Sequence, residues 1–174
     1  MDIVNVLKYH DLTDVVLLEH SYAGLVMTCV AEQVPERLAH VVYLDAFVPM
    51  DDEPVSRSDF YAPDEWETME AAADDHAGGW LLPGDHPGWV GISDANTRWM
   101  RENAVPHPLN TFRQSVTVRN PAAAVLPHSY ILCTENGMDD SILDMIRQLC
   151  EQREWALREL DTGHWPIWCP CLVN

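Results

Sequence analysis

The chain has 174 residues, of which 28 are acidic and 10 are basic, so its formal net charge is −18. This length suits one domain with an apolar core, and the charge argues against sequence-independent binding to nucleic acids or anionic membranes. The five cysteines lack CxxC spacing, and neither a signal peptide nor a membrane helix is recognisable, which favours a soluble cytoplasmic protein without disulfides or a metal site.

Hydrophobic periodicity in the first fifty residues predicts an alternation of helix and strand. A short helix is expected over Asp2–His10, and the aliphatic run Val15–Leu18 predicts a strand buried on both faces of a parallel sheet. After Ser21, apolar residues recur at helical spacing until Pro35. A second strand is expected over His40–Leu44, parallel to the first because the intervening helix has crossover length. Ser21 should therefore lie on a sharp turn at the carboxyl end of a strand.

Between about residues 50 and 127 the periodicity breaks, and prolines and acidic residues accumulate. This segment also contains four tryptophans, namely Trp66, Trp80, Trp89 and Trp99. We interpret it as a helical cap inserted into a single domain that covers residues 1–174. Helices are expected over Asp64–Ala73 and Asp94–Glu102, each with its first aspartate as the N-cap.

The α/β alternation resumes after the cap. Strands are expected over Ser129–Cys133 and Trp155–Leu160, with an amphipathic helix over Asp139–Cys150 between them. The expected inward-facing residues of this helix are Ile142, Met145, Ile146 and Leu149. The fold class predicted for the whole chain is α/β, with a mostly parallel sheet and flanking helices.

Two residues at the predicted strand ends suit nucleophilic catalysis. A serine on a strand-to-helix turn presents its hydroxyl above the sheet and directs the next backbone N–H groups toward a developing oxyanion. Ser21 fits this role, with the amide of Tyr22 as the oxyanion donor, although a serine here could also simply cap the helix. His164 follows the last strand at the same sheet edge, where an imidazole could take the serine proton.

Six ordered segments carry a resemblance to a known family. They are Val15–Val26, Pro35–Arg37, Val42–Pro49, Pro106–Leu109, Tyr130–Thr134 and Glu159–His164. The set resembles small bacterial α/β hydrolases, relatives of plant methylesterases and hydroxynitrile lyases. The resemblance implies a partial α/β-hydrolase fold. In the family, further strands and a His-Gly loop that contributes to the oxyanion hole come before the part that this sequence resembles, and a helix follows it. The resemblance also implies serine hydrolase chemistry without an organic cofactor.

The acid of the implied triad has more than one candidate. Plant-type relatives place it shortly after the strand that ends in Cys133 and Thr134, but Asn136 stands at that position, which leaves Glu135 or Asp139 as displaced substitutes. Asp45 is favoured, because bacterial relatives with a Leu-Asp-Ala-Phe-Val-Pro segment resemble this chain there. Asp45 could alternatively only cap a turn.

The first functional hypothesis is an esterase that cleaves small carboxylic esters by a Ser21, His164 and Asp45 mechanism. Its substrate would carry a mainly apolar group, and the expected substrate contacts are His20, Trp66, Trp80 and Trp165. The alternative is a catalytically impaired relative that binds a small apolar ligand or a partner protein. Glu19 favours it, because the turn normally has a small residue there and a carboxylate could oppose the negative transition state. A hydroxynitrile lyase is a third option.

The open edge of the predicted sheet indicates the oligomeric state of the protein. A parallel sheet with an uncovered apolar edge must be covered or paired, so we expect a dimer or larger homo-oligomer. The partners expected overall are therefore a small-molecule ester and a second copy of the chain, with neither nucleic acid nor membrane.

Overall fold

The computed structural model describes residues 2–84 and 92–168. They form two compact units, of which the first comprises Met1–Val55, Val116–Thr134 and Met138–Asp161. The second comprises Ser56–Ser115, Glu135–Gly137 and Thr162–Asn174. The organisation as one domain with a cap over about residues 50–127 stays a prediction. No helix in the described part of the chain is long and apolar enough to span a membrane.

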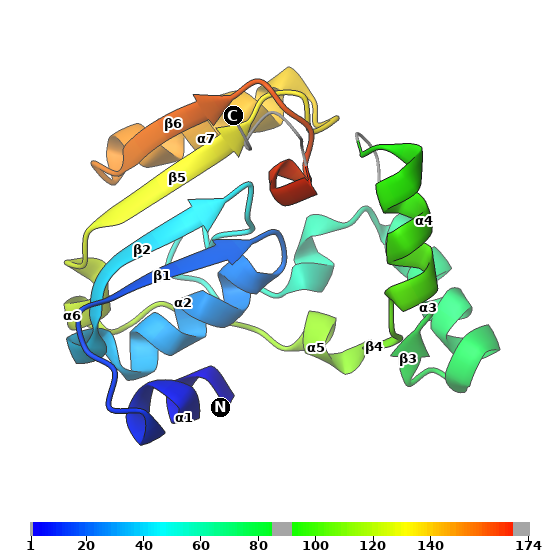
Figure 1. Cartoon of the computed structure of the whole chain (residues 1–174), viewed down its shortest axis with the longest axis horizontal. Coiled ribbons are helices and arrows are strands. Elements are labelled where there is room, and N and C mark those ends of the chain that lie inside the picture. Colours follow the sequence, from blue (N-terminus) through cyan, green and yellow to red (C-terminus); the bar gives the residue numbers. More distant parts are fainter. Residues whose placement is uncertain (1, 85–91, 169–174) are drawn as a thin grey trace. The chain divides into compact units, whose positions relative to one another are not determined.

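A four-stranded parallel sheet forms the centre of the first unit, with the strand order β1-β2-β5-β6 (Figure 1). The elements of this unit are α1 (Asp2–Tyr9), β1 (Val15–His20), α2 (Ala23–Gln33), η1 (Pro35–Arg37), β2 (Leu38–Leu44), α6 (Pro121–Ala124), β5 (His128–Cys133), α7 (Asp140–Gln152) and β6 (Ala156–Leu160). The predicted α/β class, with a parallel sheet and flanking helices, is confirmed, and the element boundaries lie within a few residues of those expected.

One face of the sheet carries the main apolar core. The strands contribute Leu17, Val41, Tyr43, Tyr130 and Leu132, which the strand register places on the same face. Helices α2 and α7 cover this face, and they contribute Val30, Ala31, Val34, Leu143, Ile146, Leu149 and Cys150 to the same cluster.

The expected inward face of α7 was partly wrong. Ile142 and Met145 are 38% and 44% exposed, whereas Leu143 and Cys150 are buried beside the expected Ile146. Two apolar stripes of this helix overlap at Ile146 and Leu149, and helical periodicity does not distinguish them.

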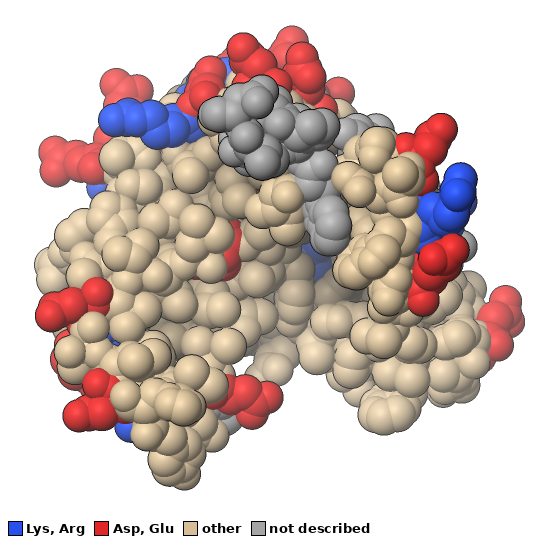
Figure 2. All heavy atoms as spheres, in the orientation of Figure 1, with Lys and Arg blue, Asp and Glu red and all other residues tan. Residues whose placement is uncertain are grey.

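The expectation that the first strand is buried on both faces was also wrong. Along β1 the burial alternates, so that Leu17 and Glu19 are buried while Val16 and Leu18 are 62% and 54% exposed. β1 is an edge strand of the described sheet, and successive side chains of a strand point to opposite faces. Mostly neutral side chains lie over β1 and β2 in the view of Figure 2, with acidic groups toward the margins.

The second unit is built from short elements around a small core. They are η2 (Arg57–Phe60), α3 (Pro63–Ala77), β3 (Leu81–Leu82), α4 (Asp94–Asn103), β4 (His107–Pro108), α5 (Asn110–Arg113) and η3 (Pro166–Trp168). Strands β3 and β4 pair antiparallel. The core consists of Ala73, Leu82 and Leu109, with Trp66 and other side chains packed around it.

Both helices expected in this segment are present, but the expected N-caps were wrong. Helix α3 begins at Pro63, and the side chain of Glu65 accepts a hydrogen bond from the Ala62 N–H (2.9 Å). Helix α4 is capped by Ser93, whose hydroxyl accepts from the Asn96 N–H (3.3 Å). The aspartates instead lie in the first turn, where the helix dipole favours them without a capping bond.

Candidate active site

Ser21 stands on the turn between β1 and α2, as predicted. Its φ angle is 57°, a left-handed conformation that residues other than glycine seldom adopt. The Ser21 N–H donates to the carbonyl oxygen of Leu44 at the end of β2 (3.3 Å), and the Ser21 carbonyl accepts from the N–H groups of Gly24 (3.1 Å) and Phe47 (3.0 Å). These bonds fix a serine in a strained conformation at the carboxyl edge of the sheet, which is the geometry of a nucleophile elbow.

Gly24 makes this turn possible, although it was not among the residues singled out from the sequence. A Cβ at this position would overlap the carbonyl oxygen of Phe47 and crowd Ala46. The first turn of α2 therefore lies against the backbone that follows β2. The glycine three residues after the serine was the available sequence signal, because glycine permits such close backbone approach.

Asp45 lies next to the elbow in the same unit. Its two chain neighbours, Leu44 and Ala46, are buried, and the backbone bonds of Ser21 to Leu44 and Phe47 flank it. Asp45 is 2% exposed and has a φ of 44°. Its N–H donates to the Ile131 carbonyl (2.8 Å), and its Oδ1 accepts from the Cys133 N–H (3.2 Å).

The carboxylate of Asp45 also affects its neighbours electrostatically. Burial, and secondly the charge of Asp45, raise the pKa of the Cys133 thiol to about 12. The same two causes raise the pKa of Tyr130, whose hydroxyl donates to the Ala46 carbonyl (2.8 Å). Ser21 and Asp45 are two left-handed residues on adjoining strand ends; the structure gives Ser21 three backbone bonds, and Asp45 one backbone bond and one side-chain bond.

Glu19 does not carry the charge that the sequence suggested. Its side chain is 2% exposed on the covered face of β1, and neither carboxyl oxygen has a hydrogen-bond partner among the described residues. Burial raises its pKa to about 9. The carboxyl is therefore protonated at neutral pH, which argues against a negative charge that opposes the transition state, and the effect of Glu19 on activity stays a prediction.

His164 belongs to the second unit, whereas Ser21 and Asp45 belong to the first. It is half-buried and its ring meets that of Trp165 edge to face at 5.4 Å between centroids. The segment is anchored by Thr162, whose carbonyl accepts from the Glu135 N–H (3.0 Å). The structure therefore brings Ser21 and Asp45 together, and the pairing of His164 with Ser21 stays a prediction.

The other expected site residues divide between the two units. In the first unit, His20 ends β1 and Tyr22 stands at the N-cap of α2, so both adjoin Ser21 in the chain. In the second unit, Trp66 packs on the small core and lies under the guanidinium of Arg113, 5.7 Å from its ring centroid. Trp80 is 62% exposed, and Trp165 neighbours His164. Packing alone accounts for the position of Trp66, and its role in substrate binding stays a prediction.

Some residues that the sequence analysis considered for a metal site or for the cap lie outside the described ranges. Within residues 2–84 and 92–168, no group of three or more histidine, cysteine, aspartate or glutamate side chains is arranged to hold a metal ion. Trp89, Cys169 and Cys171 lie outside the described residues.

Known proteins resemble this chain over most of its length. A carbendazim-hydrolyzing esterase from Nocardioides sp. (strain SG-4G) is 28% identical over 171 residues, which cover 94% of this chain and 69% of the relative. An extracellular alpha/beta-hydrolase from a Paenibacillus species superimposes with a TM-score of 0.72 at 22% identity, covering 93% of this chain and 69% of that one. A methylesterase from Arabidopsis superimposes with a TM-score of 0.65 at 16% identity, covering 98% and 70%.

The structural likenesses at this identity establish the fold, which is a partial α/β-hydrolase fold. The sequence pattern of the Alpha/beta hydrolase family matches residues 1–174. Together with the serine elbow at the end of β1, this match means that the chain belongs to the alpha/beta hydrolase family and is related to esterases.

Proposed function

We propose that this protein is a serine hydrolase that cleaves small carboxylic esters. Ser21 is the nucleophile, His164 the general base and Asp45 the acid that orients the imidazole. The observation that carries the proposal is the left-handed conformation of Ser21 on a strand-to-helix turn. A strained serine in this place has a catalytic use, and a serine that merely capped the helix would not need the strain.

In the proposed reaction, the Ser21 hydroxyl oxygen attacks the ester carbonyl carbon while His164 takes the hydroxyl proton. The oxyanion that forms is stabilised by the Tyr22 amide at the N-terminus of α2, where the helix dipole is positive. The protonated His164 then gives its proton to the leaving alcohol, and water releases the acid from Ser21 by the same steps. The reaction needs neither a metal nor an organic cofactor.

Two observations favour the ester hydrolase over a catalytically impaired binding protein. The neutral state of Glu19 at pH 7 removes an electrostatic objection to an oxyanion beside Ser21. The relatives from Nocardioides and Arabidopsis are named as esterases, which supports ester substrates as a class. The proposed contacts for the substrate are His20 beside the nucleophile and, in the second unit, Trp66, Trp80 and Trp165.

We further propose that the protein self-associates through the open face of β1. Val16 and Leu18 expose apolar side chains there, and a second copy would remove them from water. Light scattering tests the assembly: a monodisperse monomer at micromolar concentration refutes it, and Leu18→Lys is expected to shift an oligomer toward monomer.

The cytoplasm is the proposed compartment, which fits the free thiols of Cys29, Cys133 and Cys150.

The test of the catalytic proposal is covalent labelling with a fluorophosphonate, which reacts with activated serines. Wild type is expected to label with one equivalent, and both Ser21→Ala and His164→Ala are expected to abolish it. Ser115→Ala and His76→Ala are matched controls, because both residues are exposed and should leave labelling unchanged. A folded wild type that does not label contradicts the proposal.

The same assay identifies the acid. Asp45→Asn is expected to slow labelling strongly, whereas Glu135→Gln and Asp139→Asn should retain it. The reverse pattern would assign the acid to the loop after β5 and leave Asp45 as a structural residue of the turn.

A further inference from the structure

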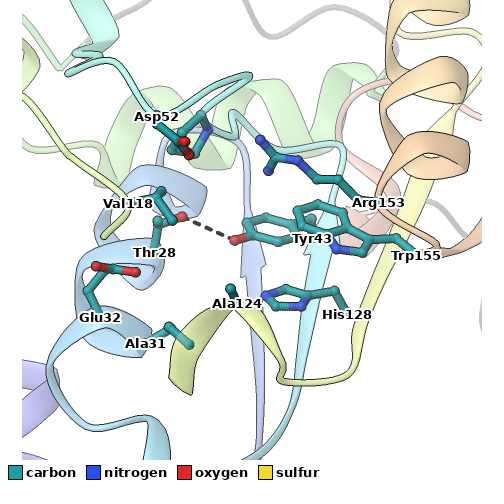
Figure 3. A pocket seen from close by; sticks show the side chains of 12 residues that line it. Thr28, Ala31, Glu32, Tyr43, Asp52, Val118, Ala124, His128, Arg153 and Trp155 are labelled. Carbon is teal, nitrogen blue, oxygen red and sulfur yellow. Dashed lines mark hydrogen bonds between the residues drawn. The ribbon is translucent and has the colours of Figure 1, made fainter. Parts of the chain in front are cut away.

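The first unit contains a cavity of about 290 Å³ whose lining includes none of the proposed catalytic residues. His128 begins β5 and Trp155 directly precedes β6, so both mark the amino ends of their strands, whereas Ser21 and Asp45 lie at carboxyl ends. Figure 3 shows the cavity with Thr28 and Glu32 of α2 on one side and with Arg153, Trp155 and His128 on the other. This site is separate from the proposed catalytic residues.

Three parallel rings form one wall of the cavity. Trp155 stacks on His128, with 4.6 Å between centroids, and on Tyr43, with 5.1 Å. Small apolar side chains, among them Ala31 and Ala124, line the cavity near this wall. Such a lining suits a small ligand with a flat or aliphatic body, and the volume lies near the lower end of the range for small-molecule sites.

The hydrogen bonds already made in this wall leave mainly acceptors for a ligand. The hydroxyl proton of Thr28 goes to the Gly24 carbonyl (2.8 Å), so the Tyr43 hydroxyl must donate its own proton to Thr28 Oγ1 (3.1 Å). His128 Nδ1 lies 2.7 Å from the Leu126 carbonyl, which can only accept, so Nδ1 carries the hydrogen. Because burial lowers the pKa of His128, the ring is neutral at pH 7, and its Nε2 is an acceptor.

Glu32 is the strongest acceptor at the cavity. Its Oε2 accepts from the backbone N–H groups of Arg119 and Asn120, both at 2.8 Å, which fixes the carboxylate in place. Its Oε1 is buried and has no hydrogen-bond partner among the described residues. A buried carboxylate oxygen without a donor is costly, so a positive charge close to Glu32 is favoured.

The lining also contains one positive group, the guanidinium of Arg153. Arg153 donates to the Met50 carbonyl (3.0 Å), and its guanidinium carbon lies 5.2 Å from the centroid of the Trp155 ring. Asp52 adds a further acidic side chain to the lining. The lining therefore contains two acidic side chains, Glu32 and Asp52, and one guanidinium, which gives it a formal excess of negative charge.

We propose that this cavity binds a small organic ammonium ion with an aromatic body, whose positive charge is paired with the Glu32 carboxylate and whose ring packs beside Tyr43, His128 and Trp155. The overall charge of −18 draws cations toward the protein. The site would act as a second, non-catalytic ligand site of the hydrolase, independent of Ser21.

The test is a titration of the protein with phenethylammonium chloride, followed by two-dimensional ¹H–¹⁵N NMR. The amide signals of Arg119 and Asn120 and the indole signal of Trp155 are expected to shift together and saturate. The neutral analogue 2-phenylethanol, matched in size, is expected to bind at least about tenfold more weakly, since a hydrogen bond to a charged group is lost.

Three variants locate the site. Glu32→Gln keeps an acceptor for Arg119 and Asn120 but removes the charge, and it is expected to weaken amine binding about tenfold or more. Ala124→Phe, at an exposed alanine on the cavity lining, is expected to block binding while the protein stays folded. Ser21→Ala is expected to bind the amine like wild type.

The proposal is overturned by any of three results. One is equal binding of phenethylammonium and 2-phenylethanol, which would remove the role of charge. Another is an unchanged affinity in Glu32→Gln with a wild-type melting temperature. The third is no saturable shift at the Arg119, Asn120 and Trp155 signals.

Discussion

Glu19 is expected to make the stability of this protein fall as the pH rises, and Glu19→Gln to remove that dependence. The side chain is 2% exposed, and burial raises its pKa from an ordinary value of 4.5 to about 9. Each unit of difference between the folded and unfolded pKa corresponds to about 1.4 kcal/mol. The free energy of unfolding should therefore fall by about 6 kcal/mol between pH 4.5 and about 9, and about 3 kcal/mol of this loss should occur by pH 7.

The sign follows from which state binds the proton. Below pH 4.5 the carboxyl is protonated in both states and contributes nothing to the pH dependence. Between pH 4.5 and about 9 the unfolded chain ionises while the folded protein keeps the proton, so stability falls as the pH rises. Above about 9 the folded state ionises too, and the loss levels off. Glutamine is neutral throughout, so the variant lacks this contribution.

Urea unfolding followed by tryptophan fluorescence, repeated from pH 4.5 to 9, measures the effect. The other titrating groups are common to both proteins, so the difference in unfolding free energy isolates Glu19. Glu19→Gln should exceed wild type by about 3 kcal/mol at pH 7 and converge with it near pH 4.5. Glu36→Gln, at an exposed position, is the matched control. A pH-independent difference between Glu19→Gln and wild type would refute this reasoning.

Three further substitutions test the construction of the elbow, each by chemical unfolding. Ser21→Gly is expected to stabilise the fold by roughly 1 kcal/mol, because glycine tolerates the φ of 57°, and an equal or lower stability would contradict the strain. Gly24→Ala should destabilise by several kcal/mol, about 3 or more, since its Cβ overlaps the Phe47 carbonyl oxygen; a near-neutral effect argues against this packing. Tyr130→Phe should cost about 1–2 kcal/mol by leaving the buried Ala46 carbonyl without its donor, and wild-type stability would count against that bond.

Local pattern was enough to predict the elements that carry the site. The apolar run that ends near Leu18 and the helical spacing after Ser21 are properties of neighbouring residues, and they predicted the strand, the turn and the helix. The position of Asp45 at the end of the next strand followed from the same reasoning. The left-handed φ of Ser21 and Asp45 could not be predicted from the sequence, because it depends on the backbone bonds between the two strand ends.

The features that the sequence pattern could not predict depend on which surfaces of the sheet are covered by other elements. Leu18 looks as apolar as Leu17, yet one is exposed and the other buried, because α2 and α7 pack on the same face of the sheet. The neutral state of Glu19 likewise follows from its place on that face. The unpartnered oxygen of Glu32 depends on backbone groups that lie far away in the sequence, so no local signal marks it.

The strained turn at Ser21 is supported by residues of the first unit. The backbone bonds of Ser21 to Leu44, Gly24 and Phe47, together with the close approach of Gly24 to Phe47, fix its left-handed conformation. The proposed base, His164, is contributed by the second unit. Two separate measurements therefore test the proposed site: Gly24→Ala should lower the free energy of unfolding, and His164→Ala should abolish fluorophosphonate labelling.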